Sequence, residues 1–199
     1  MRYCRDMPAP LSKERRRLLG LVADHILEHG VNDISLSSLA RSIGSNNRML
    51  LYYFGSKEDL LDEASLTALE RFPGIHHLMG ELDEDGEPEV LLNRAWTRIA
   101  DKRNRPFLKL FFELFSLHAR RPERNDGYFR RIATQWPEGV ARLLVREGAD
   151  PATAEVCAVS IVGLWRGLQI SLLAGVDADE LTAAHRRSLA ALLAPVPAS

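Results

Sequence analysis

The sequence predicts an all-α protein, and three observations support this fold class. Apolar residues recur at intervals of three and four along most of the chain, which is the spacing of one face of an α-helix. No segment shows sustained alternation of apolar and polar residues, and no hairpin turn dipeptide separates two β-branched runs. Hydrophobic residues make up 46% and charged residues 27% of the 199 residues, a globular composition that excludes disordered and collagen-like chains.

The first expected helix covers residues 12–28 and is amphipathic. Leu18, Val22 and Ile26 form one apolar stripe along it. Gly30 follows the last turn, where a residue with a left-handed backbone conformation is favoured. The ten residues at the N-terminus include two prolines and are expected to form a frayed arm.

Three more helices are expected over 36–43, 47–53 and 57–71, each preceded by a polar residue that can cap its N-terminus. The capping residues are Ser35, Asn46 and Ser56. Gly44 can end the first of these helices. Asp59 stands at the third position of the last one, as in a capping box.

The C-terminal two thirds begins with an acidic segment and continues as helices. Residues 81–89 hold six acidic residues and no basic residue, so we expect a solvated loop there. Pro137 is expected to kink or split the third helix beyond it, and residues 195–197 to form a tail. The helices expected beyond the loop cover 88–102, 105–119, 126–147, 152–174 and 178–193.

Residues 35–57 form the segment that is most informative about function. A short capped helix, a turn with a glycine and a second short helix make a helix-turn-helix, whose second helix enters the major groove of DNA. From Ile34 to Lys57 there is no acidic residue, while Arg41, Arg48 and Lys57 supply three positive charges. This local charge favours a polyanion as the partner.

Side chains of two kinds in this segment are suited to DNA. Asparagine and arginine at the start of the second helix can read base edges, because arginine pairs with guanine and asparagine with adenine. The candidate base-reading residues are Asn46, Asn47 and Arg48. Hydroxyl, ammonium and free backbone N–H groups suit phosphate oxygens. The candidate phosphate ligands of this kind are Tyr52, Tyr53 and Lys57.

The same pattern also fits proteins that never bind DNA. Two short helices around a glycine occur in many all-helical proteins, and an excess of three charges over 24 residues is modest. Two other classes therefore stay open on these residues alone. One is a helical bundle that binds or converts a small molecule, and the other is a protein-interaction module.

Residues 34–61 resemble the N-terminal DNA-binding domain of the TetR family of bacterial transcriptional regulators. The matching positions are in order and correctly spaced. They are the hydroxyl residue Ser35, the pair Leu39 and Ala40, the turn glycine Gly44, the aromatic block Tyr52, Tyr53 and Phe54, and the helix start from Ser56 to Leu61. Three positions depart from the family pattern, namely Ser45, Arg48 and Leu51, so the resemblance does not imply an operator sequence.

The resemblance implies a DNA-binding domain over 11–71 and an effector-binding and dimerisation domain over 72–195. It implies that Asn47 and Arg48 contact bases and adds Ser35 to the phosphate ligands. It also implies a ligand-responsive transcriptional regulator, most often a repressor that a small effector releases from double-stranded operator DNA.

The helix expected over 152–174 is apolar around most of its circumference and must be covered on several sides. Two glycines four residues apart let another helix approach closely. The resemblance implies that this helix and the last one form half of an intermolecular four-helix bundle, which makes a two-fold homodimer; the alternative is a core helix of a monomer. The predicted interface residues are Val159, Gly163, Gly167, Ile170, Leu189 and Leu193.

Aromatic residues are concentrated in the helices that would enclose a pocket, which suits a small apolar or aromatic effector. Core packing explains most of these rings equally well. Arg98 and Arg166 lie among apolar neighbours and can meet an acidic ligand, although a surface arginine is the commoner outcome. The predicted pocket residues are Trp96, Phe111, Phe115, Trp136, Trp165 and Arg166.

Nothing in the sequence predicts catalysis, a cofactor or a metal site. His25 and His29 have a spacing that can hold zinc, but no third ligand accompanies them. Cys4 and Cys157 cannot build a disulfide framework, so a reduced, cytoplasmic setting is expected. No secretory signal occurs, and no apolar run approaches the roughly 20 residues of a membrane span, so no membrane partner is expected.

Overall fold

A computed structural model of the chain describes residues 13–120 and 128–194, and every regular element in those ranges is helical. The all-α prediction is therefore confirmed. The expected N-terminal arm with Cys4 and the expected C-terminal tail lie outside the described residues. The chain divides into two compact units, with the boundary between Arg71 and Phe72.

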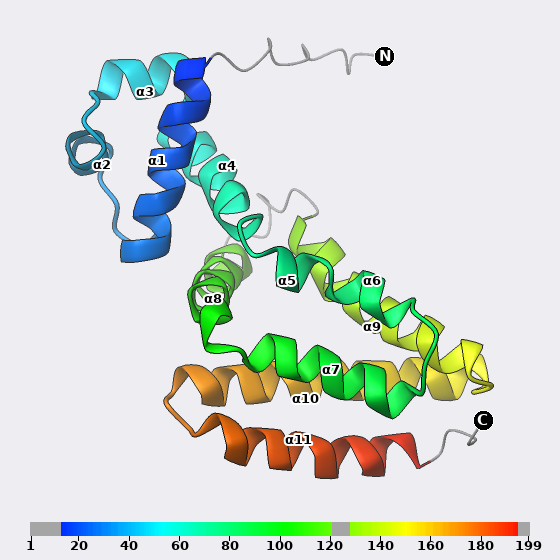
Figure 1. The fold of residues 1–199 in the computed structure, drawn as a ribbon. Coiled ribbons are helices and arrows are strands. Elements are labelled where there is room, and N and C mark those ends of the chain that lie inside the picture. The colour runs from blue at the N-terminus through cyan, green and yellow to red at the C-terminus, as the bar shows by residue number, and fades with distance from the viewer. Residues whose placement is uncertain (1–12, 121–127, 195–199) are drawn as a thin grey trace, which may run out of the picture. The chain divides into compact units, whose positions relative to one another are not determined.

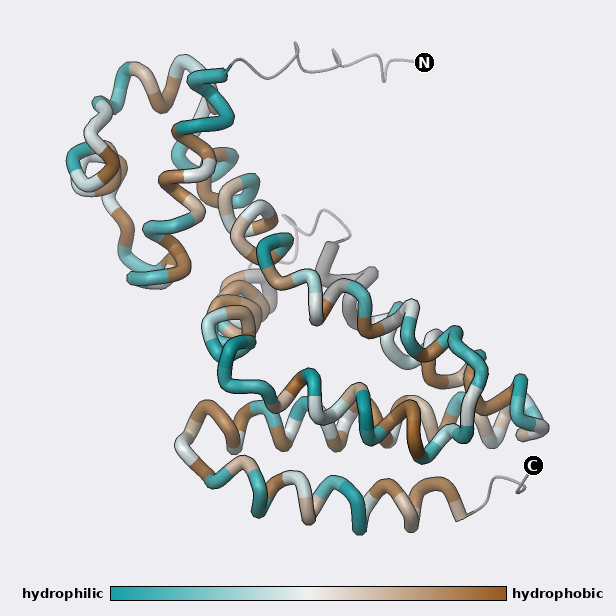
Figure 2. The backbone as a smooth tube through the Cα atoms, in the orientation of Figure 1, coloured by the Kyte–Doolittle hydropathy of each residue, from teal (hydrophilic) through white to brown (hydrophobic). Residues whose placement is uncertain are grey.

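The N-terminal unit contains four helices around one apolar core (Figure 1). They are α1 (Lys13–His29), α2 (Leu36–Ser42), α3 (Asn47–Phe54) and α4 (Lys57–Leu69). The predicted stripe Leu18, Val22 and Ile26 of α1 is buried, together with Leu39 of α2 and Leu50 of α3. Each of these side chains contributes about 1.5–3 kcal/mol when it leaves water. In Figure 2, hydrophobic (brown) and hydrophilic (teal) segments recur along the helices of this unit.

The caps and the turn predicted for α2 and α3 are confirmed. The Ser35 hydroxyl accepts a hydrogen bond from the backbone N–H of Ser38 (3.1 Å). The side-chain oxygen of Asn46 accepts one from the backbone N–H of Met49 (3.0 Å). Gly44 has φ 65°, so it adopts the left-handed conformation that ends α2 and turns the chain toward α3.

The C-terminal unit is a bundle of five long helices preceded by two short ones (Figure 1). Its elements are α5 (Pro73–His76), α6 (Leu78–Leu82), α7 (Pro88–Ala100), the 3-10 turn η1 (Lys102–Asn104), α8 (Arg105–Arg120), α9 (Tyr128–Arg146), α10 (Pro151–Leu173) and α11 (Ala178–Leu193). α10 is the central helix, because it packs against α7, α8, α9 and α11. All five predicted long helices are confirmed, with ends within two residues of the prediction.

The acidic segment at 81–89 contains the predicted solvated loop at its centre, where residues 83–87 are exposed and non-helical. Its first residues belong to α6 and its last to α7, and arginines of α7 and α9 bind the turn between them. The ion pairs are Arg94 with Glu84 (2.7 Å), Arg98 with Glu81 (2.5 Å) and Arg142 with Asp83 (3.6 Å). Arg146 also donates to the backbone carbonyls of Leu82 (3.1 Å) and Glu84 (2.9 Å). These arginine contacts were not predicted, because the partners lie ten or more residues away in the sequence.

Pro137 does not split α9, because the helix continues through this residue, and a kink there stays a prediction. A proline removes one backbone hydrogen bond from a helix interior and crowds the preceding turn. The contact between α9 and α10 is the most extensive between any two described helices. We infer that this packing offsets the local cost.

One helix, α10, differs from the expectation that no apolar run approaches the length of a membrane span. Its 23 residues are long and apolar enough to cross a bilayer by length and composition. The sequence did not reveal a segment of this length because the polar residues Arg166 and Gln169 interrupt its apolar run. In the structure α10 is the core helix of the C-terminal unit, and its buried residues include Ile161 and Trp165. Core packing accounts for much of its apolar character.

Candidate nucleic-acid interface

Helix α3 has two distinct faces. Leu50 and Phe54, four residues apart, are buried in the N-terminal unit. Asn47 and Arg48 are exposed, and Tyr52 is 78% exposed. A helix that enters the major groove needs this arrangement, in which one stripe anchors it and the other meets the bases.

The three candidate base-reading residues differ in how their side chains are engaged. The Asn46 side-chain oxygen caps α3, as described above. The Asn47 amide nitrogen donates to the hydroxyl of Ser37 in α2 (2.9 Å). Arg48 has no hydrogen bond or ion pair with any described residue. Of the three, Arg48 can therefore reach a base edge without giving up a contact.

The four candidate phosphate ligands lie at helix ends or on the surface. Ser35 precedes α2, and Lys57 is the first residue of α4, so both stand beside backbone N–H groups at a helix N-terminus. The rings of Tyr52 and Tyr53 meet edge to face at a centroid distance of 5.0 Å. Contact of these four side chains with DNA stays a prediction.

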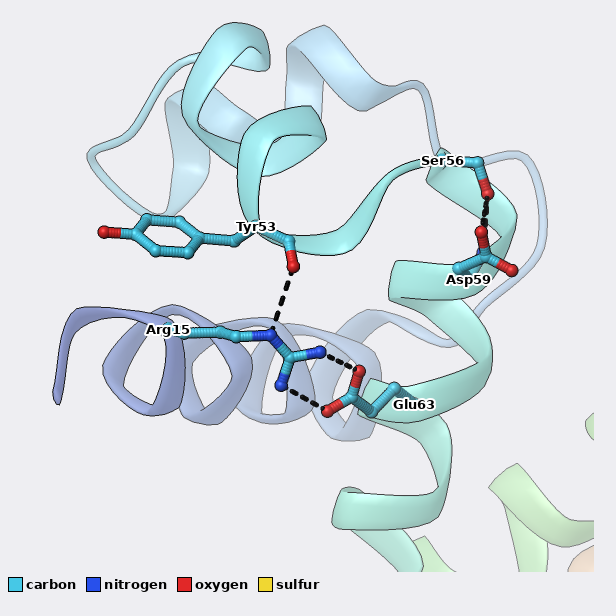
Figure 3. A network of polar contacts seen from close by, with 5 residues as sticks. All are labelled: Arg15, Tyr53, Ser56, Asp59 and Glu63. Carbon is cyan, nitrogen blue, oxygen red and sulfur yellow. Dashed lines mark hydrogen bonds and ion pairs between the residues drawn. The ribbon is translucent and has the colours of Figure 1, made fainter. Parts of the chain in front are cut away.

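Arg15 of α1 connects α3 with α4, as Figure 3 shows. Its Nε donates to the backbone carbonyl of Tyr53 in the last turn of α3 (3.1 Å). Its Nη1 and Nη2 donate to the two carboxylate oxygens of Glu63 in α4 (2.8 and 2.6 Å). The Arg15 Cζ also lies 4.6 Å from the centroid of the Phe54 ring. This bidentate pair holds the end of the candidate reading helix against the rest of the unit.

The sequence analysis missed Arg15 and Glu63. One signal was present, because Arg15 lies three residues before Leu18 and four before Leu19, on the side of α1 that is buried. An arginine on such a face needs a partner. The identity of that partner is not local information, since Glu63 lies 48 residues away.

The start of α4 has the predicted cap (Figure 3). The backbone N–H of Asp59 donates to the Ser56 hydroxyl oxygen (3.0 Å), and that hydroxyl donates to the Asp59 carboxylate (2.6 Å). The Ser56 cap is therefore confirmed, but the second bond of a capping box is not formed, because the backbone N–H of Ser56 donates to the Phe54 carbonyl (3.0 Å). The cap orders the helix start at which Lys57 stands.

Residues 23–64 match the model of a family described as bacterial regulatory proteins, tetR family. The matched range covers α2, the turn and α3, which together form the helix-turn-helix. The N-terminal unit belongs to the TetR family. No curated protein sequence matches the chain.

Solved structures of regulatory and small-molecule-binding proteins share the fold over most of the chain. A transcriptional regulator from Rhodococcus sp. Rha1 is 19% identical, with 89% of this chain and 95% of that chain covered and a TM-score of 0.69. A TetR transcription regulator from Haloarcula marismortui is 21% identical, with 89% and 94% covered and a TM-score of 0.64. The multidrug binding protein EbrR complexed with imidazole is 24% identical, with 97% and 96% covered and a TM-score of 0.62.

Two of the residues predicted for the effector pocket, Trp96 and Trp165, are fully buried. Their indole N–H groups donate to the Thr182 hydroxyl (3.1 Å) and to Nε2 of His185 (3.0 Å). Both rings also lie close to the His185 imidazole, with centroid distances of 5.2 and 6.5 Å. Burial, and then repulsion by Arg186, lower the pKa of His185 to about 4. These surroundings are those of core residues.

Of the other predicted pocket residues, Phe111 and Trp136 contact Arg166, and Phe115 contacts Phe111. The Arg166 Cζ lies 4.5 Å from the ring centroid of Phe111 and 4.3 Å from that of Trp136. Phe115, which is 52% exposed, stacks on Phe111 at 6.4 Å. Burial lowers the pKa of Arg166 to about 10.

A groove of about 820 Å³ lies elsewhere, between α9 and α10, and no predicted pocket residue lines it. Its walls include Ala141 and Val145 of α9 and Val159 of α10. The groove therefore adjoins the face of α10 predicted to form a dimer.

The predicted dimer residues fall into two groups. Val159 and Ile170 are 62% and 55% exposed, and Gly163 and Gly167 between them are exposed as well. All four lie on one stripe of α10. Leu189 is fully buried within the protomer, so it belongs to the core of the C-terminal unit, and Leu193 is partly exposed. An interface on α10 stays a prediction.

The described residues contain no group of three or more histidine, cysteine or acidic side chains that could hold a metal ion. The rings of His25 and His29 stack on each other at a centroid distance of 4.5 Å on the surface of α1.

Proposed function

We propose that the protein is a cytoplasmic transcriptional repressor that binds operator DNA as a homodimer and leaves it when a small effector binds. The observation that carries the DNA-binding part is the geometry of α3. Its buried stripe holds it in the N-terminal unit, and its exposed N-terminal face presents Asn47 and Arg48. The TetR-family match of residues 23–64 supports this reading.

The exposed stripe of α10 supports the homodimer. Its apolar side chains lose contact with water if a second copy covers them, and the two glycines let the partner helix come close. A two-fold dimer places two copies of α3 in major grooves about one helical turn apart. Each reading helix then recognises one half of a two-fold symmetric operator.

The aromatic residues around Arg166 support an effector site in the C-terminal unit. EbrR, which has a similar fold and is a multidrug binding protein, supports a response to small molecules. The effector acts by a population shift, because it favours a conformation in which the two reading helices no longer match adjacent grooves.

The test is a gel-shift titration with the DNA upstream of the protein's own coding region, with and without heparin. A repressor gives a retarded complex that survives heparin and is lost with scrambled DNA of equal length. Absence of a specific complex contradicts the proposal. Retained binding of small molecules would then favour a helical bundle, and binding to a protein alone an interaction module.

A further inference from the structure

The guanidinium group of Arg166 carries a positive charge without a counter-charge. It lies among residues of α8, α9 and α10, with the rings of Phe111 and Trp136 within 4.5 Å of its Cζ. No carboxylate of the described residues forms an ion pair with it, and burial alone accounts for its lowered pKa. A charge removed from water in this way is normally paired.

Most of the hydrogen-bond donors of Arg166 also lack an acceptor. A guanidinium group has five N–H donors. Among the described residues one of them is used, by Nη1, which donates to the side-chain oxygen of Gln169 (3.1 Å). Aromatic faces stabilise the charge but are weak acceptors for N–H groups.

Two buried side chains of the same unit also have N–H groups without a hydrogen-bond acceptor. Gln169 is fully buried, and because its oxygen accepts from Arg166, its amide nitrogen points elsewhere and finds no partner. His185 accepts from Trp165 through Nε2, so its proton is on Nδ1, and this atom too is buried without a partner. All of these groups are donors. At the partly exposed Arg166, a ligand that fills the remaining N–H groups supplies acceptor atoms, and next to a cation an anion is favoured.

The surroundings of Arg166 indicate the rest of the ligand. Arg166 is partly exposed, so a solute can reach it. Phe111 continues into the stacked and half-exposed Phe115, one turn further along α8. Trp136 contacts the guanidinium from α9. These rings favour a flat apolar body attached to the anionic group.

We propose that the C-terminal unit binds a small organic acid, whose carboxylate pairs with Arg166 and whose apolar body contacts Phe111, Phe115 and Trp136. The proposal rests on the effector response proposed above and names its chemical class. A carboxylate matches the guanidinium because two of its oxygens can accept two parallel N–H groups.

The test compares acids with neutral amides of the same shape by isothermal titration calorimetry on the full chain. The pairs are benzoate with benzamide, 1-naphthoate with 1-naphthamide, and octanoate with octanamide. We expect at least one acid to bind the wild-type protein ten or more times more tightly than its amide. Arg166→Met should remove this preference, and Arg142→Met, which changes an exposed arginine of α9, should keep it.

A second variant tests the role of Arg166 independently, in case Arg166→Met does not fold. Gln169→Glu places a carboxylate beside the guanidinium, so it should weaken acid binding at least tenfold by competing for Arg166. The proposal is wrong if no acid binds the wild type better than its amide, or if Arg166→Met and Gln169→Glu both keep the preference while their circular dichroism spectra match the wild type.

A gel shift with the same acid separates this proposal from the proposed function. Binding of an acid through Arg166 that leaves DNA affinity unchanged contradicts the effector response but not the site. If a neutral amide releases the DNA and no acid is preferred, the proposed carboxylate site at Arg166 is wrong, but the proposed release of DNA by a small effector stands.

Discussion

Arg48 and Lys57 are both cationic residues of the helix-turn-helix, but their positions predict different roles. Lys57 stands at the start of α4, so Lys57→Ala should weaken binding to all sequences alike and lower the salt slope by about one. Arg48 lies on the exposed face of α3, and Arg48→Ala should cost about 1–3 kcal/mol and relax preference at one base pair. Anisotropy titrations at several salt concentrations, with the operator and its point variants, measure both effects. If neither variant changes the titration, α3 is not the reading helix.

His185 predicts a loss of stability in mild acid. Its pKa is about 4 in the folded chain against an ordinary value of 6.5, so between these pH values the unfolded chain binds a proton that the folded chain does not. The free energy of unfolding should therefore fall as the pH is lowered from 6.5 to 4, by at most about 3 kcal/mol from this residue. Urea denaturation at pH 7 and pH 4.5 measures the change. The variant His185→Gln should show a smaller fall, and an equal fall would assign the effect to other groups.

At the scale of elements, Arg15 is expected to stabilise the end of α3 through its contacts with Tyr53 and Glu63. Arg15→Met leaves a carbonyl and a carboxylate without their partner, which should lower the free energy of unfolding by about 1–3 kcal/mol. DNA affinity should fall with no change in salt slope, because the residue is not expected to contact DNA. Arg17→Met is the control, since the exposed pair of Arg17 with Glu14 should contribute less than about 1 kcal/mol. Equal effects of the two variants would show that Arg15 does not have this role.

The exposed stripe of α10 predicts that a single charge placed on it prevents the formation of the dimer. Ile170→Glu should convert the dimer to a monomer, because two copies of the new carboxylate would be buried near the two-fold axis without partners. Val90→Glu on α7 is the control, since Val90 is also 55% exposed but lies off the stripe. Sedimentation equilibrium measures the mass of each variant. A dimeric Ile170→Glu, or a monomeric wild type, would remove α10 from the interface.

The elements that the sequence predicted correctly depend on neighbours close along the chain. Stripes such as Leu18, Val22 and Ile26 and caps such as Ser56 are set within one or two turns of helix, so spacing alone reveals them. The failures involve distant partners. Arginines of α7 and α9 bind the acidic turn, and Glu63 binds Arg15 across 48 residues. The exposed face of α3 followed from its pattern, whereas the group of rings around Arg166 required the packing of three helices.

At the scale of the whole molecule, a two-fold dimer predicts a strict dependence on operator spacing. Inserting five base pairs between the half-sites rotates one of them by about half a turn, so only one reading helix can engage. Affinity should fall by at least tenfold, and inserting ten base pairs should restore part of it. Gel shifts with the three DNA fragments make the comparison. Equal affinity for all three would show that one copy of the chain binds alone.

The eight residues of α3 are too few to hold a helical conformation as a free peptide. The helical conformation of α3 is stabilised by the burial of Leu50 and Phe54 and by the Asn46 cap, whereas the side chain of the exposed Arg48 makes no hydrogen bond or ion pair with the described residues that stabilises it. Folding and the proposed reading of DNA thereby depend on different side chains of the same short segment. After a gene duplication, substitutions of a few exposed residues of α3 can consequently change the DNA sequence that is bound without unfolding the helix. The same substitutions offer a route for engineering the specificity of the protein.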